Sequence, residues 1–297
     1  MKISHLVNFS MQFLTTAVET LSRRIALSGL MSRGAAEKAI KQGLVSVEGR
    51  IVTTGSEKVP DTSQVLVNGS IVPSPPPTPP LWGLIKPRGV FCEYMRERDK
   101  IFLPDLLDRW ERRKVRNIGP RGLSELDSSS LSSKHFIVVN RIPAMCSGLV
   151  LLTTDGNFSR KLIEPESKIL TTFRVRVGNL TDTQIADIRQ WKAGIRAASI
   201  DYGPVFIDVE KRTPTQTWLK VRLVDGGKSG KSLSDLFFFR AGIRVNRINC
   251  FAFGPYTIGD VPEGQVLPLP IHESISHLLP KREIKPVLVK SFHSTHR

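Results

Sequence analysis

The sequence predicts an α+β fold divided into two domains, and three observations support this prediction. The chain has 297 residues, enough for one large hydrophobic core and a smaller module. Short helical and strand patterns alternate in residues 18–72, whereas longer strand-like apolar runs dominate residues 81–270. A proline-rich segment, residues 73–80, separates these regions. Such a segment favours an extended polyproline spacer of about 3.1 Å per residue, which would hold two domains apart.

The first region predicts two helices followed by short strands. Apolar residues recur at helical spacing from Leu21 to Leu30 and again from Ala35 to Ile40. Ser32 is placed to cap the second helix and Gly43 to end it. Alternating apolar segments follow, and each is interrupted by a dipeptide typical of a β-hairpin turn: Glu48-Gly49 and Asn68-Gly69.

Basic side chains on these helices predict a surface for an anionic partner: Arg23, Arg24, Arg33, Lys38 and Lys41. Residues 18–72 resemble an S4-type RNA-binding domain, and the matching positions are Ser32, Arg33, Ala36, Ile40, Gly43, Val45, Val47, Gly49 and Val65. The resemblance implies that this small αβ module binds RNA.

The charge of the whole chain also favours an anionic partner. Lys and Arg number 43 and Asp and Glu number 27, so the formal net charge is +16. Such a bias favours nucleic acid as the partner, with an anionic membrane second and a merely solubilising basic surface as the alternative. No run of 18 apolar residues occurs, which argues against a membrane span. We expect RNA and no membrane partner.

The two ends of the chain carry weaker signals. Residues 1–17 contain no acidic side chain and several Ser and Thr, a composition compatible with a mitochondrial transit peptide and equally with a frayed N-terminus. Residues 271–297 predict a mobile basic tail, because their histidines lack the spacing of zinc ligands: His272, His277, His293 and His296. Widely separated cysteines predict a reducing compartment and no structural metal: Cys92, Cys146 and Cys250.

The most informative stretch lies in the second region, between Val138 and Gly156. An apolar strand signal ends at Val139, an irregular segment follows, and a second apolar run begins at Leu149 and ends before an Asp155-Gly156 turn. A loop held between two core strands is a common position for catalytic side chains.

This stretch resembles the central motif of rRNA pseudouridine synthases of the RsuA type. The matching positions are Arg141, Ser147, Gly148, Leu149 and Thr153 through Gly156. A Lys-Pro-x-Gly segment that begins at Lys86, followed by a predicted helix near Leu106, is spaced as in members that act on large-subunit rRNA. The resemblance implies a mixed, largely antiparallel sheet, and chemistry without a cofactor.

The same resemblance indicates that catalysis has been lost. In the family, an aspartate acts on the flipped-out uridine, a basic residue keeps that carboxylate ionised, and a tyrosine lies against the base. These three positions fall on Pro143, Asp235 and Phe173 in this chain. Asp155 could replace the aspartate, but the family also has an aspartate there, in a turn. Cys146 could be a nucleophile, but it lacks an activating histidine nearby in sequence.

Three further segments complete the analysis. Residues 119–134 are rich in serine and predict a flexible insertion before the central loop. Gly226–Ser232 contains Gly and Lys but lacks the P-loop pattern, so we expect no nucleotide binding. Basic residues of the second region form a candidate track for RNA phosphates: Lys86, Arg88, Arg112, Arg113, Lys114 and Arg141.

The sequence therefore predicts an RNA-binding, synthase-like protein without catalytic residues. Its expected partners are large-subunit rRNA with ribosomal proteins or assembly factors, in mitochondrial ribosome assembly. The alternatives are an active synthase with displaced catalytic residues and a structural ribosomal protein. We also expect a former uridine pocket lined by Arg141, Phe173 and the apolar run at Leu149, where an unstacked base could still bind.

Overall fold

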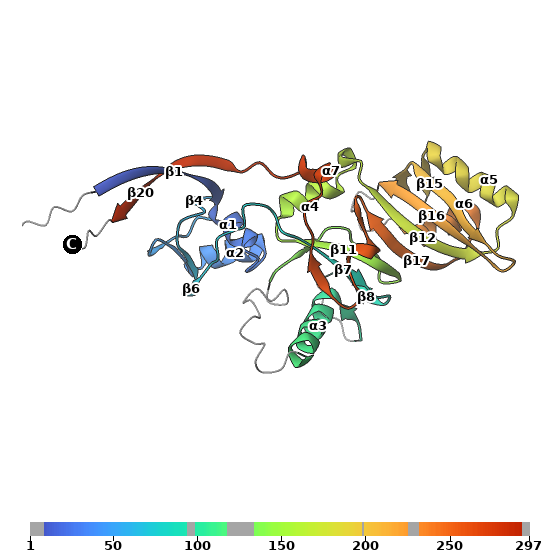
Figure 1. Ribbon diagram of the computed structural model, residues 1–297, viewed down its shortest axis with the longest axis horizontal. Coiled ribbons are helices and arrows are strands. Elements are labelled where there is room, and N and C mark those ends of the chain that lie inside the picture. Colours follow the sequence, from blue (N-terminus) through green and yellow to red (C-terminus); the bar gives the residue numbers. More distant parts are fainter. Residues whose placement is uncertain (1–8, 94–98, 118–133, 198, 225–231, 293–297) are drawn as a thin grey trace, which may run out of the picture. The chain divides into compact units, whose positions relative to one another are not determined.

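The computed structural model describes residues 9–93, 99–117, 134–197, 199–224 and 232–292, and these divide into two compact units (Figure 1). The first unit combines residues up to Pro77 with those from Pro280 onward, and the second spans Thr78–Leu279. The expected insertion at residues 119–133 and the glycine-rich residues 226–231 lie outside the described residues. Within the described residues, no helix has the length and apolarity needed to cross a membrane.

The first unit contains the two helices and the hairpins that the sequence predicts. Ser32 begins α2, because its hydroxyl accepts a hydrogen bond from the amide of Ala35. Both residues of the Glu48-Gly49 and Asn68-Gly69 turns have positive φ, as a two-residue hairpin requires. The elements are α1 (Leu21–Leu27) and α2 (Arg33–Lys41), and a sheet in the order β3 (Arg50–Ile51), β2 (Val45–Val47), β5 (Val65–Val67) and β6 (Ser70–Ile71).

The ends of the chain form a strand pair, which corrects two predictions. The strand β1 (Phe9–Thr20) pairs antiparallel with β20 (Glu283–Phe292), from Phe9 opposite Phe292 to Val18 opposite Glu283. A third strand, β4 (Lys58–Pro60), pairs with the other edge of β1. The predictions of a frayed N-terminus and a mobile tail are therefore wrong for these residues. Local composition does not reveal backbone pairing between segments so distant in sequence.

Two arginines fix the first half of the proline-rich segment to the first unit. The guanidinium of Arg24 donates to the carbonyl of Pro73 over 2.7 Å, and that of Arg282 donates to Pro76 over 2.6 Å. Arg282 also bonds Asp61 over 2.9 Å. Residues 73–77 thus belong to the first unit, so the segment is not a free spacer along its whole length.

A mixed, largely antiparallel sheet organises the second unit, as the family resemblance implies. Its strand order is β15-β16-β12-β17-β11-β7-β19; only β11 and β17 pair in parallel along that order. The strands are β7 (Leu81–Lys86), β11 (Cys146–Thr153), β12 (Leu170–Gly178), β15 (Val205–Arg212), β16 (Gln216–Val224), β17 (Val245–Phe253) and β19 (Val266–Pro268), with β10 (Ile137–Val138) and β18 (Tyr256–Thr257) attached to β11 and β17.

Helices and small strand pairs complete the second unit. The helices are α3 (Leu103–Asn117), α4 (Gly156–Ile163), α5 (Asp182–Arg189), α6 (Leu233–Ala241) and α7 (Glu273–Ser276), with 3-10 turns η2 (Pro165–Ser167), η3 (Gln190–Ala193) and η4 (Ile258–Asp260). The short pairs are β8 (Val90–Phe91) with β9 (Ile101–Phe102), and β13 (Ile195–Ala197) with β14 (Ile200–Gly203).

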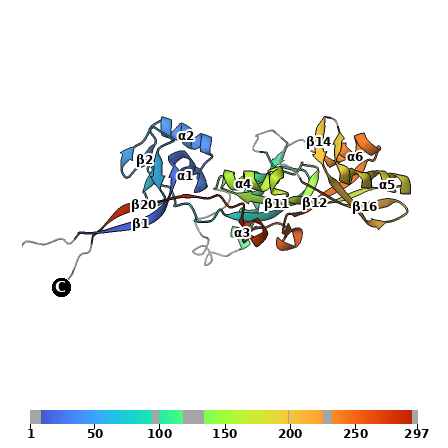
Figure 2. The ribbon, with the colours of Figure 1, turned by 90° about the horizontal axis from the view of Figure 1, so that it is seen from above.

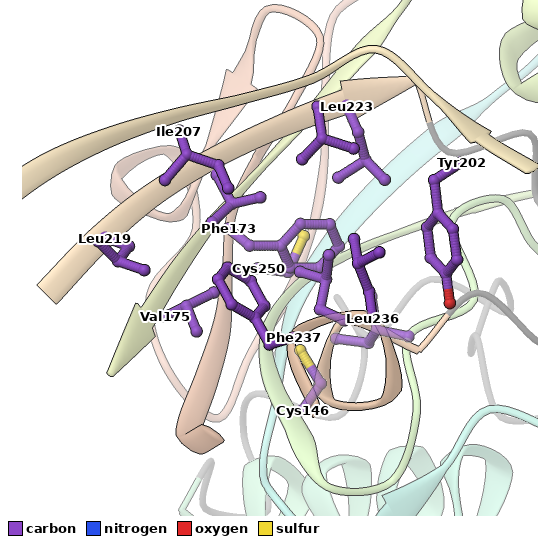
Figure 3. Packing of buried hydrophobic residues seen from close by; sticks show 14 of the residues in the cluster. Cys146, Phe173, Val175, Tyr202, Ile207, Leu219, Leu223, Leu236, Phe237 and Cys250 are labelled. Carbon is purple, nitrogen blue, oxygen red and sulfur yellow. The ribbon is translucent and has the colours of Figure 1, made fainter. Parts of the chain in front are cut away.

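The large sheet has two faces with separate cores. Val150 and Leu152 belong to a cluster that includes Phe173 and residues of α5 and α6. Figure 3 shows part of this cluster, with Phe173 beside Leu236 and Phe237 of α6. Leu149 and Leu151 belong to another cluster with residues of α4. Alternate side chains of a strand point to opposite faces. We call these sides the α6 face and the α4 face.

Candidate functional site

The central loop, residues 139–145, is fixed between β10 and β11. The amide of Val139 bonds the carbonyl of Leu151 over 2.9 Å. Asn140 is buried, and its side chain bonds the backbone of β11 twice: it donates to the carbonyl of Leu149 over 2.9 Å and accepts from the amide of Leu151 over 2.8 Å. Backbone pairing between β10 and β11 ends where the loop begins, and beyond that point the side chain of Asn140 supplies the hydrogen bonds to β11.

Lys86 holds the far side of the same loop. Its side chain is fully buried, and Nζ donates to the carbonyls of Val90 and Cys146 over 2.7 Å each, with longer bonds to Pro87 and Pro143. Burial lowers the pKa of this ammonium. Lys86 cannot reach an RNA phosphate from this position, so its assignment as an RNA-binding residue is wrong.

Gly148 places the loop against the parallel pair. Its φ is +120°, and a Cβ at this position would lie 2.2 Å from the carbonyl oxygen of Cys250 on β17. Only glycine tolerates both conditions. One residue earlier, the hydroxyl of Ser147 accepts a hydrogen bond of 3.0 Å from the side-chain Nδ2 of Asn249. The Ser-Gly pair of the motif therefore has a structural function.

The three positions that the sequence analysis predicts to correspond to the family's catalytic residues have different environments. Pro143 is exposed in the loop, and its carbonyl accepts a turn bond from the amide of Cys146 over 2.9 Å. Phe173 is buried in the core of the α6 face beside Cys250 and Phe237 (Figure 3). Asp235 is exposed in the first turn of α6.

The expected uridine pocket needs correction. Leu149 belongs to the core of the α4 face, whereas Phe173 belongs to that of the α6 face. Both side chains are packed: Leu149 is fully buried and Phe173 is 6% exposed. The two cannot line one pocket, because the sheet lies between them. With only 6% of its surface exposed, Phe173 offers a base little area for stacking in this structure.

Tyr202 is a residue of this region that sequence reasoning missed. It is buried on β14, and its hydroxyl donates to the carbonyl of Ser232, the residue that caps α6, over 3.1 Å. Burial raises the pKa of this phenol, and the nearby charge of Asp235 raises it further. The surrounding sequence gives no motif for it, because its partner lies 30 residues away.

Neither alternative catalytic residue is arranged for catalysis. Asp155 is buried at the start of α4, where one carboxylate oxygen accepts from the amides of Asn157 and Phe158. It is thus a helix cap, although the sequence suggested only a turn. Cys146 is buried, and burial raises the pKa of its thiol to about 12. A thiol with this pKa is protonated at neutral pH and is a poor nucleophile.

The predicted basic residues of the second unit lie on the central loop, on a turn bonded to it and on α3. Arg141 lies in this loop, and Arg88 lies in a turn that is bonded to it through the amide of Gly89 and the carbonyl of Ala144, over 2.7 Å. Arg112 is exposed on α3 and lies 3.6 Å from Asp108. Arg113 and Lys114 are also in α3, but their side chains lie outside the described residues.

The first unit presents part of the expected basic face. Lys38 and Lys41 are exposed on α2, and Arg33 is exposed while it pairs with Glu37 over 3.2 Å. Arg23 is half-buried and pairs with Glu19 over 3.1 Å.

Arg24 is wrongly predicted as an RNA-binding residue. Its side chain is 1% exposed and is bonded to Pro73, with Asp61 at 3.9 Å. Burial lowers the pKa of Arg24 and raises that of Asp61, although their mutual attraction opposes both shifts. The residue stabilises the first unit instead of facing a ligand.

His272 and His277 are the histidines of the C-terminal region that lie within the described residues. Within the part of the chain that the structure describes, no three His, Cys, Asp or Glu side chains are grouped as metal ligands. His272 caps α7, because its Nδ1 accepts from the amide of Ser274 over 3.1 Å.

Known proteins resemble this chain in sequence. Ribosomal large subunit pseudouridine synthase B of Bacillus subtilis is 32% identical over 179 residues, which is 60% of this chain and 63% of that protein. An uncharacterised RNA pseudouridine synthase of Mycobacterium bovis is 30% identical over 210 residues, 69% of this chain and 73% of that protein. A crystal structure of a pseudouridylate synthase matches with a TM-score of 0.49 and 19% identity, over 84% of this chain and 96% of that one. No protein-family model matches. From these sequence relationships, the chain belongs to the RNA pseudouridine synthases of the RsuA type.

Proposed function

We propose that this protein binds large-subunit rRNA without isomerising uridine and that it acts in ribosome assembly in mitochondria. The name of the Bacillus relative supports the choice of the large subunit. The exposed basic side chains beside the central loop and on α2 support RNA binding, because each can neutralise a phosphate.

Proline at position 143 is the observation that carries this proposal. Asn140, Lys86 and Gly148 fix the loop around it to the sheet. Residues 135–154 nevertheless contain no Asp or Glu, so this loop offers no carboxylate to a uridine. The phenylalanine at position 173 and the aspartate at position 235 also differ in chemistry from the family's tyrosine and basic residue.

A tritium-release assay tests the lost activity. RNA carrying 5-tritiated uridine should release no tritium with the wild-type protein, and none with Pro143→Asp, because Phe173 and Asp235 still leave the new carboxylate without its partners. An active relative of the RsuA type serves as the positive control. Tritium release by the wild type would instead favour an active synthase with displaced catalytic residues.

The role in assembly is tested in cells. The protein should co-sediment with large-subunit precursors and be absent from translating ribosomes, and its depletion should stall assembly while every modified uridine remains. Full occupancy in translating ribosomes would favour a structural ribosomal protein. Residues 1–17 fused to a fluorescent protein should direct it to mitochondria, and a cytoplasmic signal would refute that compartment.

A further inference from the structure

The α4 face of the large sheet is covered by other side chains at β11 and uncovered further along the strand order. Side chains of α4 pack against it at β11. At β12, β15 and β16, the side chains on this face are half-buried or exposed. The opposite face of these strands is covered by α5 and α6, as Figure 2 shows. We call the uncovered side of β15, β16 and β12, together with the exposed Arg247 and the half-buried Phe251 of β17, the bare face.

Basic side chains outnumber acidic ones on the bare face. The strand register places Arg174 opposite Lys220 and Arg176 opposite Arg247. Arg222 lies on the same side of β16 as Lys220. The two carboxylates at the outer strand β15 are each occupied: Asp208 pairs with Arg222 over 2.8 Å and Glu210 with Arg174 over 3.2 Å. Among the described residues, Arg176, Lys220 and Arg247 make no ion pair, so their charge is not neutralised within this part of the structure.

Aromatic rings lie beneath three of these arginines. The guanidinium carbon of Arg174 lies 4.1 Å from the ring centre of Phe251, that of Arg176 lies 5.7 Å from Trp218, and that of Arg222 lies 5.9 Å from Phe206. These distances are typical of cation–π contacts. The contacts hold the planar guanidinium groups of these arginines against aromatic rings on the bare face. The ring of Phe206 is itself 40% exposed.

We propose that the bare face binds single-stranded RNA, on the side of the sheet opposite Phe173 and α6. Unstacked bases pack against aromatic rings and guanidinium planes, while Lys and Arg contact the backbone phosphates. A duplex hides its base faces, so a single strand uses this surface more fully. The proposal rests on the proposed function as an rRNA-binding protein and adds a second contact surface to it.

Charge reversal on the bare face tests the inference with the full-length protein. Lys220→Glu/Arg247→Glu reverses two unpaired charges. Arg189→Glu/Lys192→Glu, on the exposed side of α5 and η3, is the matched control with the same change in net charge. Fluorescence anisotropy measures binding of two RNAs that share a hairpin, one blunt and one with a uridine-rich single-stranded extension.

The bare-face variant should bind the extended RNA about tenfold more weakly, and its salt slope should fall by about 1.4, since each phosphate neutralised on a single strand contributes about 0.7. Binding of the blunt hairpin should not change, and the control variant should bind both RNAs like the wild type. Phe206→Ala should weaken the extended complex at least about fivefold without any change in charge.

Three outcomes would overturn the inference. If the bare-face variant keeps wild-type affinity for both RNAs, while reversal of the basic residues on α2 weakens binding, the proposed function stands and the bare face is not an RNA site. Equal losses for both RNAs would refute the assignment to single strands. If the wild type binds neither RNA, both proposals fail, and an acidic protein becomes the partner to seek for this surface.

Discussion

At the residue scale, Lys86 is the side chain on which the central loop depends most. Its replacement by Met should lower the free energy of unfolding by about 2–4 kcal/mol, because carbonyls that bond a charged donor would lose it. Lys192→Met, at an exposed position, should stay within about 0.5 kcal/mol of the wild type. Urea unfolding followed by circular dichroism measures both, and equal stability of Lys86→Met would contradict this structural role.

The same residue predicts a pH dependence. Because burial lowers the pKa of Lys86 in the folded state, the unfolded chain, with a pKa of about 10.4, holds this proton more tightly. The contribution of Lys86 to the free energy of unfolding therefore rises as the pH increases from its lowered pKa in the folded state toward its pKa in the unfolded chain. The difference between wild type and Lys86→Met should change over this range, and a constant difference would show that Lys86 does not titrate there.

The burial of Cys146 predicts that its thiol reacts poorly with alkylating reagents in the folded protein. At pH 8 the folded protein should incorporate no iodoacetamide at this residue, because the thiol is buried and burial raises its pKa to about 12. Protein unfolded in urea should be alkylated at all three cysteines, which are buried in the native state. Mass spectrometry of peptides locates the label. Rapid native labelling of Cys146 would revive it as a candidate nucleophile.

At the element scale, the parallel pairing of β11 with β17 depends on Gly148. Gly148→Ala should cost more than about 3 kcal/mol, because it adds a clash with the backbone of Cys250 to an unfavourable positive φ. Gly178→Ala, at the end of β12 with open space around it, is the matched control and should change stability by less than about 1 kcal/mol. Thermal unfolding compares them. If Gly148→Ala is tolerated equally well, the close approach of the two strands does not constrain this position.

At the scale of the whole molecule, we expect α2 to contribute to RNA affinity through charge alone. Arg33→Glu/Lys38→Glu/Lys41→Glu should weaken binding of structured RNA regardless of its sequence, and should reduce the salt slope by about 0.9 for each phosphate that the variant no longer neutralises. Arg160→Glu/Arg189→Glu/Lys192→Glu is the matched control, because Arg160 pairs with Glu164 over 3.2 Å as Arg33 does with Glu37. Unchanged affinity and slope in the α2 variant would show that this helix does not bind RNA.

The sequence by itself determined those features whose causes are local. The cap at Ser32 and the turn at Asn68-Gly69 follow from residue chemistry within a few positions. The short strands on either side of Glu48-Gly49 and Asn68-Gly69 follow from alternating apolar residues, which is the periodicity of a strand with one buried face. The charge excess, the position of the central loop and the proline at position 143 are properties of the sequence and needed no coordinates.

Only the tertiary structure decided which basic residues are available to a ligand and which face each apolar residue covers. Arg24 is buried because Asp61 and Pro73 surround it, and Asp61 in turn bonds Arg282, which is 221 residues away. Likewise, the ammonium of Lys86 donates hydrogen bonds to the carbonyls of Pro143 and Cys146, which lie 57 and 60 residues further along the chain. The separation of Leu149 from Phe173 depends on strand pairing, as does the joining of β1 to β20. Burial and pairing are set by contacts between distant segments, and a pattern within one segment does not contain them.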